Sequence, residues 1–232
     1  MQVKNSVVLV TGANRGLGQA FVNALLQEGA TKIYAAARDP RSITLQGVVP
    51  IQLDVTNAAD IAGAASRCTD LTLLINNAGI YRSTAFLAPG SANAARAELE
   101  TNFFGPLALS LAFAPILKAN GGGAIVNVLS VLSWLNISAG ATYSASKSAA
   151  WSLTNGLRGE LRPQGTQVVG VHVGFMDTDM ASGVTMPKVD PLDVARQTLI
   201  ALAEGKDEVL ADDLSRHVKQ GLSAGAYLGQ VA

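Results

Sequence analysis

The fold is decided near the start of the chain by one continuous stretch, Val7-Val8-Leu9-Val10-Thr11-Gly12-Ala13-Asn14-Arg15-Gly16-Leu17-Gly18. Its first four residues form an unbroken aliphatic run, which is typical of a strand covered on both faces. The glycines that follow allow the backbone to turn tightly before a helix begins. This order of buried strand, glycine-rich turn and helix predicts the start of a doubly wound α/β fold.

The same alternation continues along the chain. Short apolar runs predict strands, the last of them weaker, at Ser6–Val10, Lys32–Ala36, Val48–Gln52, Leu71–Ile75, Ala124–Val128, Gln167–Val173 and Glu208–Ala211. Longer stretches predict helices at Leu17–Glu28, Ala58–Ser66, Ala92–Lys118, Thr142–Arg162, Pro191–Ala203 and Asp213–Ser223. This order indicates a parallel sheet with helices on both faces, in one Rossmann-fold domain over residues 1–232.

Composition favours small-molecule chemistry. The chain is 49% hydrophobic and 15% charged, and its 17 basic and 17 acidic residues give a formal net charge of zero. A neutral chain has no cationic field to gather nucleic acid or anionic lipid, so we expect neither as a partner. The apolar segment 124–141 is interrupted by asparagine and serine, which disfavours a membrane span.

The redox and targeting signals suggest the cytoplasm. Cys68 is the only cysteine, which excludes an internal disulfide and fits a reducing compartment. The apolar run at residues 7–10 is too short for the core of a signal peptide. The two histidines, His172 and His217, lie far apart in sequence, and we expect no metal ion.

The glycine-rich turn predicts a dinucleotide site. Free amides at the start of a helix attract a pyrophosphate, and glycines let the ligand approach the backbone. The spacing is G-x-x-x-G-x-G rather than the common G-x-G-x-x-G, and the alternative is a plain tight turn. After the second strand the chain has Ala37 and Arg38 where an acidic residue would select NADH.

These residues predict a preference for NADP(H). Arg38 and Arg15 could clamp a 2′-phosphate, since guanidinium groups match phosphate oxygens. We expect NADPH to bind at least tenfold more tightly than NADH, about 1.4 kcal/mol. The alternative is that both arginines are solvated surface charges.

An acid/base pair lies further along the chain. Tyr143 and Lys147 are four residues apart, so they share one face of a helix, and Ser130 precedes Tyr143 by thirteen residues. An ammonium group near a phenol favours its ionised form and lowers the phenol pKa. Separately, the tyrosine and the lysine would be ordinary surface residues, whereas together with Ser130 they indicate catalysis.

Taken together, these motifs resemble the short-chain dehydrogenase/reductase family over nearly the whole chain. The matching elements are the glycine turn, Asp54-Val55, Asn76-Asn77-Ala78-Gly79, Asn102, Ser130 and Tyr143-Ser144-Ala145-Ser146-Lys147. One departure is Val173, which stands where the family usually has proline before Gly174, and this predicts a less restrained loop.

The resemblance implies roles for individual residues. Tyr143 would be the general acid/base, Lys147 would lower its pKa and bind the nicotinamide ribose, Ser130 would bind the substrate oxygen, and Asn102 would hold a water that relays protons. The residues implied in binding the cofactor are Gly12, Asn14, Arg15, Gly16, Leu17, Gly18, Arg38, Asp54, Val55, Asn77, Ala78, Gly79, Tyr143, Lys147, Gly174, Phe175 and Thr178.

The expected activity is NADPH-dependent reduction of a ketone or aldehyde, by a carbonyl reductase or ketoreductase. Mostly apolar residues would line the substrate cleft: Tyr81, Val131, Leu132, Trp134, Ile137, Met180 and Met186. For each of them, core packing is the alternative. A homotetramer or homodimer is implied by the resemblance. The competing functions are a non-catalytic NADP(H)-binding sensor or scaffold, and a related reaction such as epimerisation or dehydration.

Overall fold

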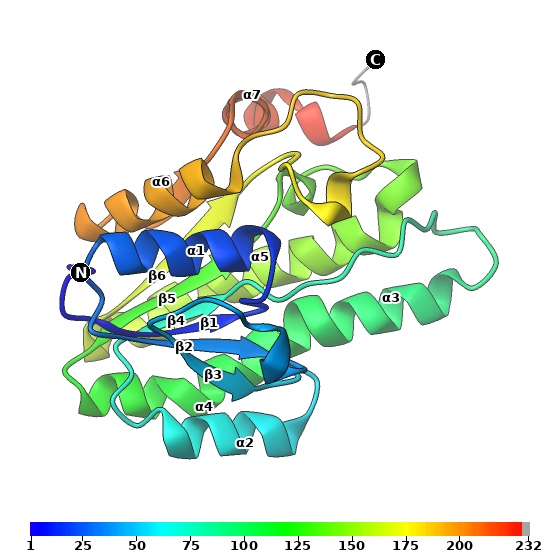
Figure 1. Ribbon diagram of the computed structural model, residues 1–232. Coiled ribbons are helices and arrows are strands. Elements are labelled where there is room, and N and C mark those ends of the chain that lie inside the picture. The colour runs from blue at the N-terminus through cyan, green and yellow to red at the C-terminus, as the bar shows by residue number, and fades with distance from the viewer. Residues whose placement is uncertain (229–232) are drawn as a thin grey trace.

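The computed structural model describes residues 1–228 and contains one parallel sheet of seven strands (Figure 1). The strands are β1 (Val7–Thr11), β2 (Lys32–Ala37), β3 (Val49–Gln52), β4 (Leu73–Asn76), β5 (Gly123–Val128), β6 (Thr166–His172) and β7 (Glu208–Leu210). They are ordered β3-β2-β1-β4-β5-β6-β7 in the sheet. The order reverses between β1 and β4, where doubly wound folds bind ligands.

Helices cover both faces of the sheet (Figure 1). They are α1 (Gly16–Gln27), α2 (Ala58–Arg67), α3 (Ser91–Leu99), α4 (Gly105–Ala119), α5 (Ala141–Leu161), α6 (Pro191–Ala203) and α7 (Asp213–Gly221). One core cluster packs α1 and α6 on one face, and a second packs α2, α4 and α5 on the other. The predicted doubly wound fold is confirmed, and most predicted boundaries are within two residues of the observed ones.

The predicted helix Ala92–Lys118 is present but is not uniform. A π-helical segment, Glu100–Phe104, separates α3 from α4, and Gly105 N–H donates to the carbonyl of Glu100, five residues back. Pro106 has no N–H and cannot make the usual bond to the carbonyl of Asn102. Such π segments are frequent at functional sites, and this one contains Asn102.

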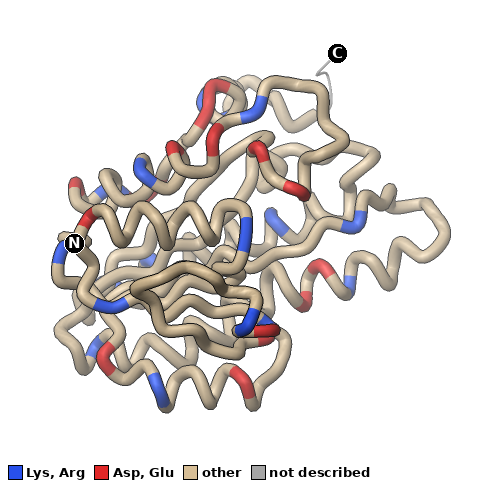
Figure 2. Tube along the Cα trace, viewed as in Figure 1, with Lys and Arg blue, Asp and Glu red and all other residues tan. Residues whose placement is uncertain are grey.

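By length and composition alone, the combined helical run at 91–119 would also suit a membrane span. In this fold its buried side chains include Leu109, Phe113 and Leu117, which pack in the core cluster beneath the sheet. Charged residues of both signs are interspersed over the surface, as expected from the neutral net charge (Figure 2). The predicted domain of residues 1–232 extends past the described residues, and the sheet with its helices occupies residues 7–221.

Candidate active site

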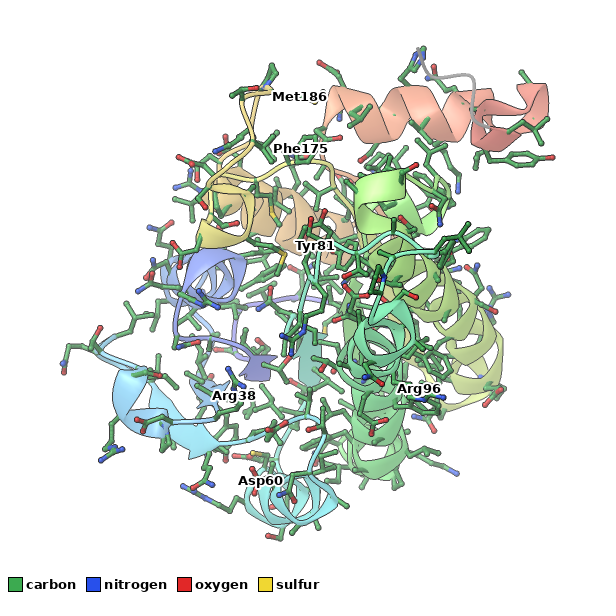
Figure 3. All side chains as sticks on the ribbon, turned by 90° about the vertical axis from the view of Figure 1, so that its right-hand side faces the viewer. Arg38, Asp60, Tyr81, Arg96, Phe175 and Met186 are labelled. Carbon is green, nitrogen blue, oxygen red and sulfur yellow. The ribbon has the colours of Figure 1, made fainter. Side chains whose placement is uncertain are left out.

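The predicted site residues lie at or beyond the carboxyl ends of the strands. Figure 3 looks towards this edge, with Arg38 after β2, Tyr81 in the loop after β4, and Phe175 after β6. Because all seven strands are parallel, the segments that follow β1, β4, β5 and β6 gather at one edge. The glycine turn, Ser130 and the 174–178 segment are thereby placed on the same side of the molecule.

The glycine turn is braced by the loop after β4. Asn77 donates from its side-chain amide to the carbonyl of Thr11 over 2.8 Å, and its backbone N–H donates to the Thr11 hydroxyl over 2.9 Å. Gly18 packs so closely on the turn that an added Cβ would lie 2.0 Å from the carbonyl oxygen of Gly12. Only glycine fits there, which explains one position of the motif.

The start of α1 suits a dinucleotide. Gly12 and Gly16 have φ values of +64° and +53°, which favour glycine. Within residues 1–228, no side chain caps α1 and no acidic residue lies in its first turn. Its first amides are therefore available to an anion, and the positive end of the helix dipole is not offset locally. The residues present fit the pyrophosphate of an NADP(H) or NAD(H) cofactor.

The two arginines expected to act together have different neighbours in the structure. The Arg15 guanidinium forms a 2.9 Å ion pair with Asp179, in the loop that precedes α6. Arg38 contributes to holding the pKa of Asp54 below its ordinary value, although hydrogen bonds from Thr56 are the larger cause. Arg38 therefore lies near Asp54, one of the residues implied in binding the cofactor, whereas Arg15 is engaged by Asp179.

Tyr143 and Lys147 lie side by side, as their spacing predicts. Lys147 Nζ lies 5.7 Å from the centre of the Tyr143 ring and donates to the carbonyl oxygen of Val128 over 2.7 Å. The Lys147 side chain is buried, so an ammonium group is held at the end of β5 with little water around it.

The protein's own groups shift these two pKa values in opposite directions. Desolvation raises the pKa of Tyr143 above its ordinary value, and the opposing interaction with the Ser130 hydroxyl is smaller. Burial lowers the pKa of Lys147 to about 8. In the protein alone, removal of water therefore outweighs the groups that favour the ionised phenol. The lowering of the Tyr143 pKa by Lys147 together with an oxidised nicotinamide stays a prediction.

Ser130 begins a short 3₁₀ turn directly after β5. Its hydroxyl accepts a 3.1 Å hydrogen bond from Leu132 N–H, and its own N–H donates to the Ser133 hydroxyl. This reciprocal cap fixes the direction of the Ser130 side chain. Ser133, the other serine nearby, is used to support Ser130.

Asn102 braces the loop after β4. Its amide oxygen accepts from Ile80 N–H over 2.9 Å, and its amide nitrogen donates to the Ile80 carbonyl and the Ser146 hydroxyl. One turn earlier, the fully buried Glu98 accepts from Arg82 N–H over 2.7 Å. Glu98 was not anticipated from the sequence. The water relay implied for Asn102 stays a prediction.

Tyr81 is held between these two attachments and faces the site. Its ring packs edge-on against Tyr143 with the centres 5.1 Å apart, and its hydroxyl donates to the carbonyl of Ala139. An added Cβ on Gly140 would lie 3.0 Å from the Tyr81 ring. Tyr81 is therefore a wall of the site beside the proposed acid/base.

Part of the predicted substrate lining belongs to the core. Val131 and Trp134 are buried and pack with Val218, and Leu132 packs against the same cluster. Core packing, the alternative given for each residue, therefore describes Val131 and Trp134, whereas Leu132 is only partly buried. By contrast Ile137, Met180 and Met186 are exposed.

The segment after β6 is held despite the missing proline. Val131 N–H donates to the carbonyl of Val173 over 3.0 Å, and Gly174 N–H donates to the Asp212 carboxylate. These bonds restrain the backbone on both sides of the Val173–Gly174 peptide. Gly16 lies close to Thr178, since a Cβ there would be 3.3 Å from the threonine methyl.

No group of three His, Cys, Asp or Glu side chains among residues 1–228 is arranged to hold a metal ion. The absence of a metal nevertheless stays a prediction.

Comparison with known proteins identifies the family. Residues 6–188 match the family described as short chain dehydrogenase. The chain belongs to the short-chain dehydrogenase/reductase family. Among its relatives is the short-chain dehydrogenase ptmH of Penicillium ochrochloron, 33% identical, with 89% of this chain and 79% of that protein aligned.

Solved structures of this family show the same fold. A short chain dehydrogenase from Burkholderia cenocepacia in complex with NADP is 44% identical, with a TM-score of 0.93 over 97% of this chain and 95% of that one. A short chain dehydrogenase/reductase from Burkholderia phymatum in complex with NAD is 25% identical, with a TM-score of 0.86 over 97% and 96%. The resemblance inferred from the motifs is confirmed.

Proposed function

We propose that this chain is an NADPH-dependent reductase that converts a ketone or aldehyde to an alcohol, in a reaction that is chemically reversible. The observation that carries the proposal is the placement of Tyr143 and Lys147 beside Ser130, at the sheet edge that also carries the glycine turn. Conversion of a carbonyl to an alcohol needs one hydride and one proton, and this arrangement offers a proton donor next to a dinucleotide site.

Each residue then has a defined task. The Tyr143 hydroxyl gives its proton to the carbonyl oxygen as that oxygen gains electron density. The Ser130 hydroxyl donates a hydrogen bond to the same oxygen and holds it in place. The Lys147 ammonium favours the phenolate that Tyr143 leaves behind, because opposite charges attract strongly where water is excluded. Bound NADPH supplies the hydride for the carbonyl carbon.

The preference for the phosphorylated cofactor rests on Arg38. It follows β2 directly, in the place where a carboxylate would bind ribose hydroxyls and repel a 2′-phosphate. The NADP bound by the 44%-identical Burkholderia cenocepacia protein supports this assignment. The NAD bound by the Burkholderia phymatum protein shows that the fold accommodates either cofactor.

The substrate is proposed to be an uncharged aliphatic or aromatic carbonyl compound. Exposed apolar side chains border the loop before α6, with Met180 and Met186 each about half exposed, at 53% and 54%. Lys188, the cation in that loop, lies 4.0 Å from the Asp177 carboxylate and is partly neutralised by it. Such a surface favours an apolar group over a carboxylate or phosphate.

The proposed function is tested by mixing purified protein with NADPH and a panel of ketones, aldehydes and acyl-carrier-protein thioesters, and following the loss of NADPH absorbance. Turnover of apolar carbonyls is the expected result. Binding of NADPH without turnover of any panel member would contradict the reductase and leave a cofactor-binding sensor or scaffold.

We further propose that the chain acts in the cytoplasm as a homodimer or homotetramer, assembled through α4 and α5. Leu111 of α4 and Phe104 just before it are exposed, beside an apolar hollow of about 440 Å³ between α2 and α4. Light scattering of the wild type and of Leu111→Asp tests this assembly. A wild-type mass of one chain would contradict it.

A further inference from the structure

A cluster of polar and aromatic side chains lies behind Ser130, outside the groups assigned above. Its centre is His172, the last residue of β6, which is fully buried. Its Nδ1 atom lies 3.2 Å from the backbone carbonyl oxygen of Ser130. Its Nε2 atom lies 3.5 Å from Oε1 of Glu208, on the adjacent strand β7. Both ring nitrogens therefore face oxygen atoms of groups that accept hydrogen bonds.

This geometry constrains the charge of the ring. A neutral imidazole has one donor nitrogen and one acceptor nitrogen. The Ser130 carbonyl can only accept, so Nδ1 must carry a proton. If Nε2 had none, its lone pair would face a carboxylate oxygen, which is repulsive. Among the described residues Nε2 has no hydrogen-bond partner, so its 3.5 Å contact with Glu208 is that of an ion pair. Only the doubly protonated ring both donates to Ser130 and places a positive charge beside Glu208.

Glu208 and Lys219 complete the electrostatics. Lys219 Nζ donates to the same Glu208 oxygen, Oε1, over 2.8 Å. Contacts with His172 first, and with Lys219 next, hold the pKa of Glu208 down at about 2, against the opposing effect of burial. The glutamate is therefore ionised at neutral pH and carries the negative charge that a buried imidazolium requires.

The Trp134 indole stacks on one face of the His172 ring. The indole and imidazole rings are stacked with centres 3.8 Å apart and an angle of 17° between their planes. An indole face attracts a cation, and stacking restricts rotation of the imidazole. Ser130 and Trp134 flank the same short 3₁₀ turn, which spans Val131–Ser133. His172 therefore contacts the residue at each end of that turn.

We propose that His172 is a positioning residue for Ser130: a buried imidazolium, neutralised by Glu208, that holds the Ser130 carbonyl and thereby fixes where the Ser130 hydroxyl meets the substrate oxygen. The kinetic part of this inference rests on the proposed function, because it concerns the work of Ser130 in carbonyl reduction. The reciprocal cap on Ser130 orients its side chain, and His172 orients its backbone.

The charge of the ring is tested without any turnover. The chain has two histidines, so a ¹⁵N NMR spectrum of histidine-labelled protein at pH 7 shows two rings, and His217→Gln assigns them. We expect both nitrogens of His172 to be protonated in the wild type and only one in Glu208→Gln. A neutral His172 ring in the wild type would overturn the proposed imidazolium.

The positioning role is tested by two substitutions at His172. His172→Asn places an amide N–H near the Nδ1 position and can still donate to Ser130, whereas His172→Leu cannot. We expect the leucine variant to lose about 10- to 100-fold in kcat, with NADPH affinity within twofold of the wild type, and the asparagine variant to recover most of the loss. Equal kcat in all three proteins, or equal loss in both variants at matched thermal stability, would overturn the role.

Glu208→Gln keeps the inference testable if the leucine variant does not fold. It preserves the shape of residue 208 while removing its charge, and we expect a severalfold lower kcat with an unchanged NADPH affinity. An unchanged kcat would show that a neutral His172 ring holds Ser130 equally well, and would overturn the imidazolium as the positioning group. If the wild type turned over no carbonyl compound, the proposed function would fail, and the NMR result would still decide the state of His172.

Discussion

Lys147 Nζ donates a 2.7 Å hydrogen bond to the carbonyl oxygen of Val128, so a cation carried by α5 is held against the last residue of β5. The lysine side chain is 5% exposed, and burial lowers its pKa to about 8. Desolvation therefore makes the charged form unfavourable in the folded protein. Charged groups whose pKa is shifted by burial are common in active sites, where their charge acts on substrate or cofactor.

The first prediction is that Lys147→Met raises the free energy of unfolding at pH 7 by up to about 3 kcal/mol, since one pKa unit corresponds to about 1.4 kcal/mol. The lost bond to Val128 makes the gain smaller. Below a pH of about 8 the lysine is protonated in both folded and unfolded chains, so the penalty is complete. Between a pH of about 8 and the ordinary lysine pKa, the unfolded chain binds more protons than the folded chain. The free energy of unfolding of the wild type therefore rises with pH over that range.

Urea unfolding from pH 6 to pH 10 checks this sign. Cys68 opposes the trend, because burial raises its pKa to about 12 and the unfolded chain loses that proton first. The quantity to follow is therefore the difference between wild type and Lys147→Met, with Cys68→Ala as a second background. A difference that stayed constant over this range would show that Lys147 is not desolvated.

The second prediction concerns the proton donor. Tyr143→Phe removes the hydroxyl, keeps the ring that packs on Tyr81, and should lower kcat by at least about 10³-fold, while NADPH affinity changes less than twofold. Stopped-flow fluorescence gives the affinity, and NADPH absorbance gives the rate. Tyr81→Phe is the matched control, since it removes a neighbouring phenol that bonds to Ala139 rather than to substrate. Equal losses in the two variants would mean that Tyr143 is not the acid.

Much of the site follows from residue types at fixed spacings. Tyr143 and Lys147 share a helix face by geometry alone, and Gly18 is required because the turn leaves no space for a Cβ. The alternation of strand and helix was sufficient to predict the order of elements, because a strand buried on both faces needs an unbroken apolar run.

What the sequence could not show are contacts between distant segments. Arg15 pairs with Asp179, 164 positions away, and Trp134 turns to stack on His172 rather than line the cleft. The spacing of residues also does not show how much water the surrounding fold removes from Tyr143, and that desolvation raises the pKa of Tyr143 in the protein alone. The break before Pro106 was readable in principle, because a proline cannot donate to the carbonyl four residues earlier.

The third prediction separates the two arginines. Arg38→Ala should weaken NADPH binding at least about tenfold and leave NADH binding within threefold, since only NADPH carries the 2′-phosphate. Arg15→Ala should weaken NADPH binding less, because its guanidinium is engaged by Asp179. Fluorescence titration with both cofactors measures this. A larger loss of NADPH affinity in Arg15→Ala than in Arg38→Ala would mean that Arg15, in the glycine turn, binds the 2′-phosphate instead.

The fourth prediction uses two glycines in helices. An alanine at Gly18 would place its Cβ 2.0 Å from the Gly12 carbonyl oxygen, so the turn and α1 must separate. We expect Gly18→Ala to lower the free energy of unfolding by at least about 2 kcal/mol and to weaken NADPH binding as well.

Gly63→Ala in α2 is the control. Gly63 is exposed, and among the described residues nothing lies within 4 Å of an added Cβ there. Alanine favours helix over glycine by up to about 1 kcal/mol, so this variant should be more stable than the wild type and should bind NADPH unchanged. A lower unfolding temperature for Gly18→Ala together with a higher one for Gly63→Ala would show that close packing at the turn, rather than helix propensity, requires glycine at position 18. If Gly18→Ala had the same stability and the same NADPH affinity as the wild type, the turn would have room for a side chain.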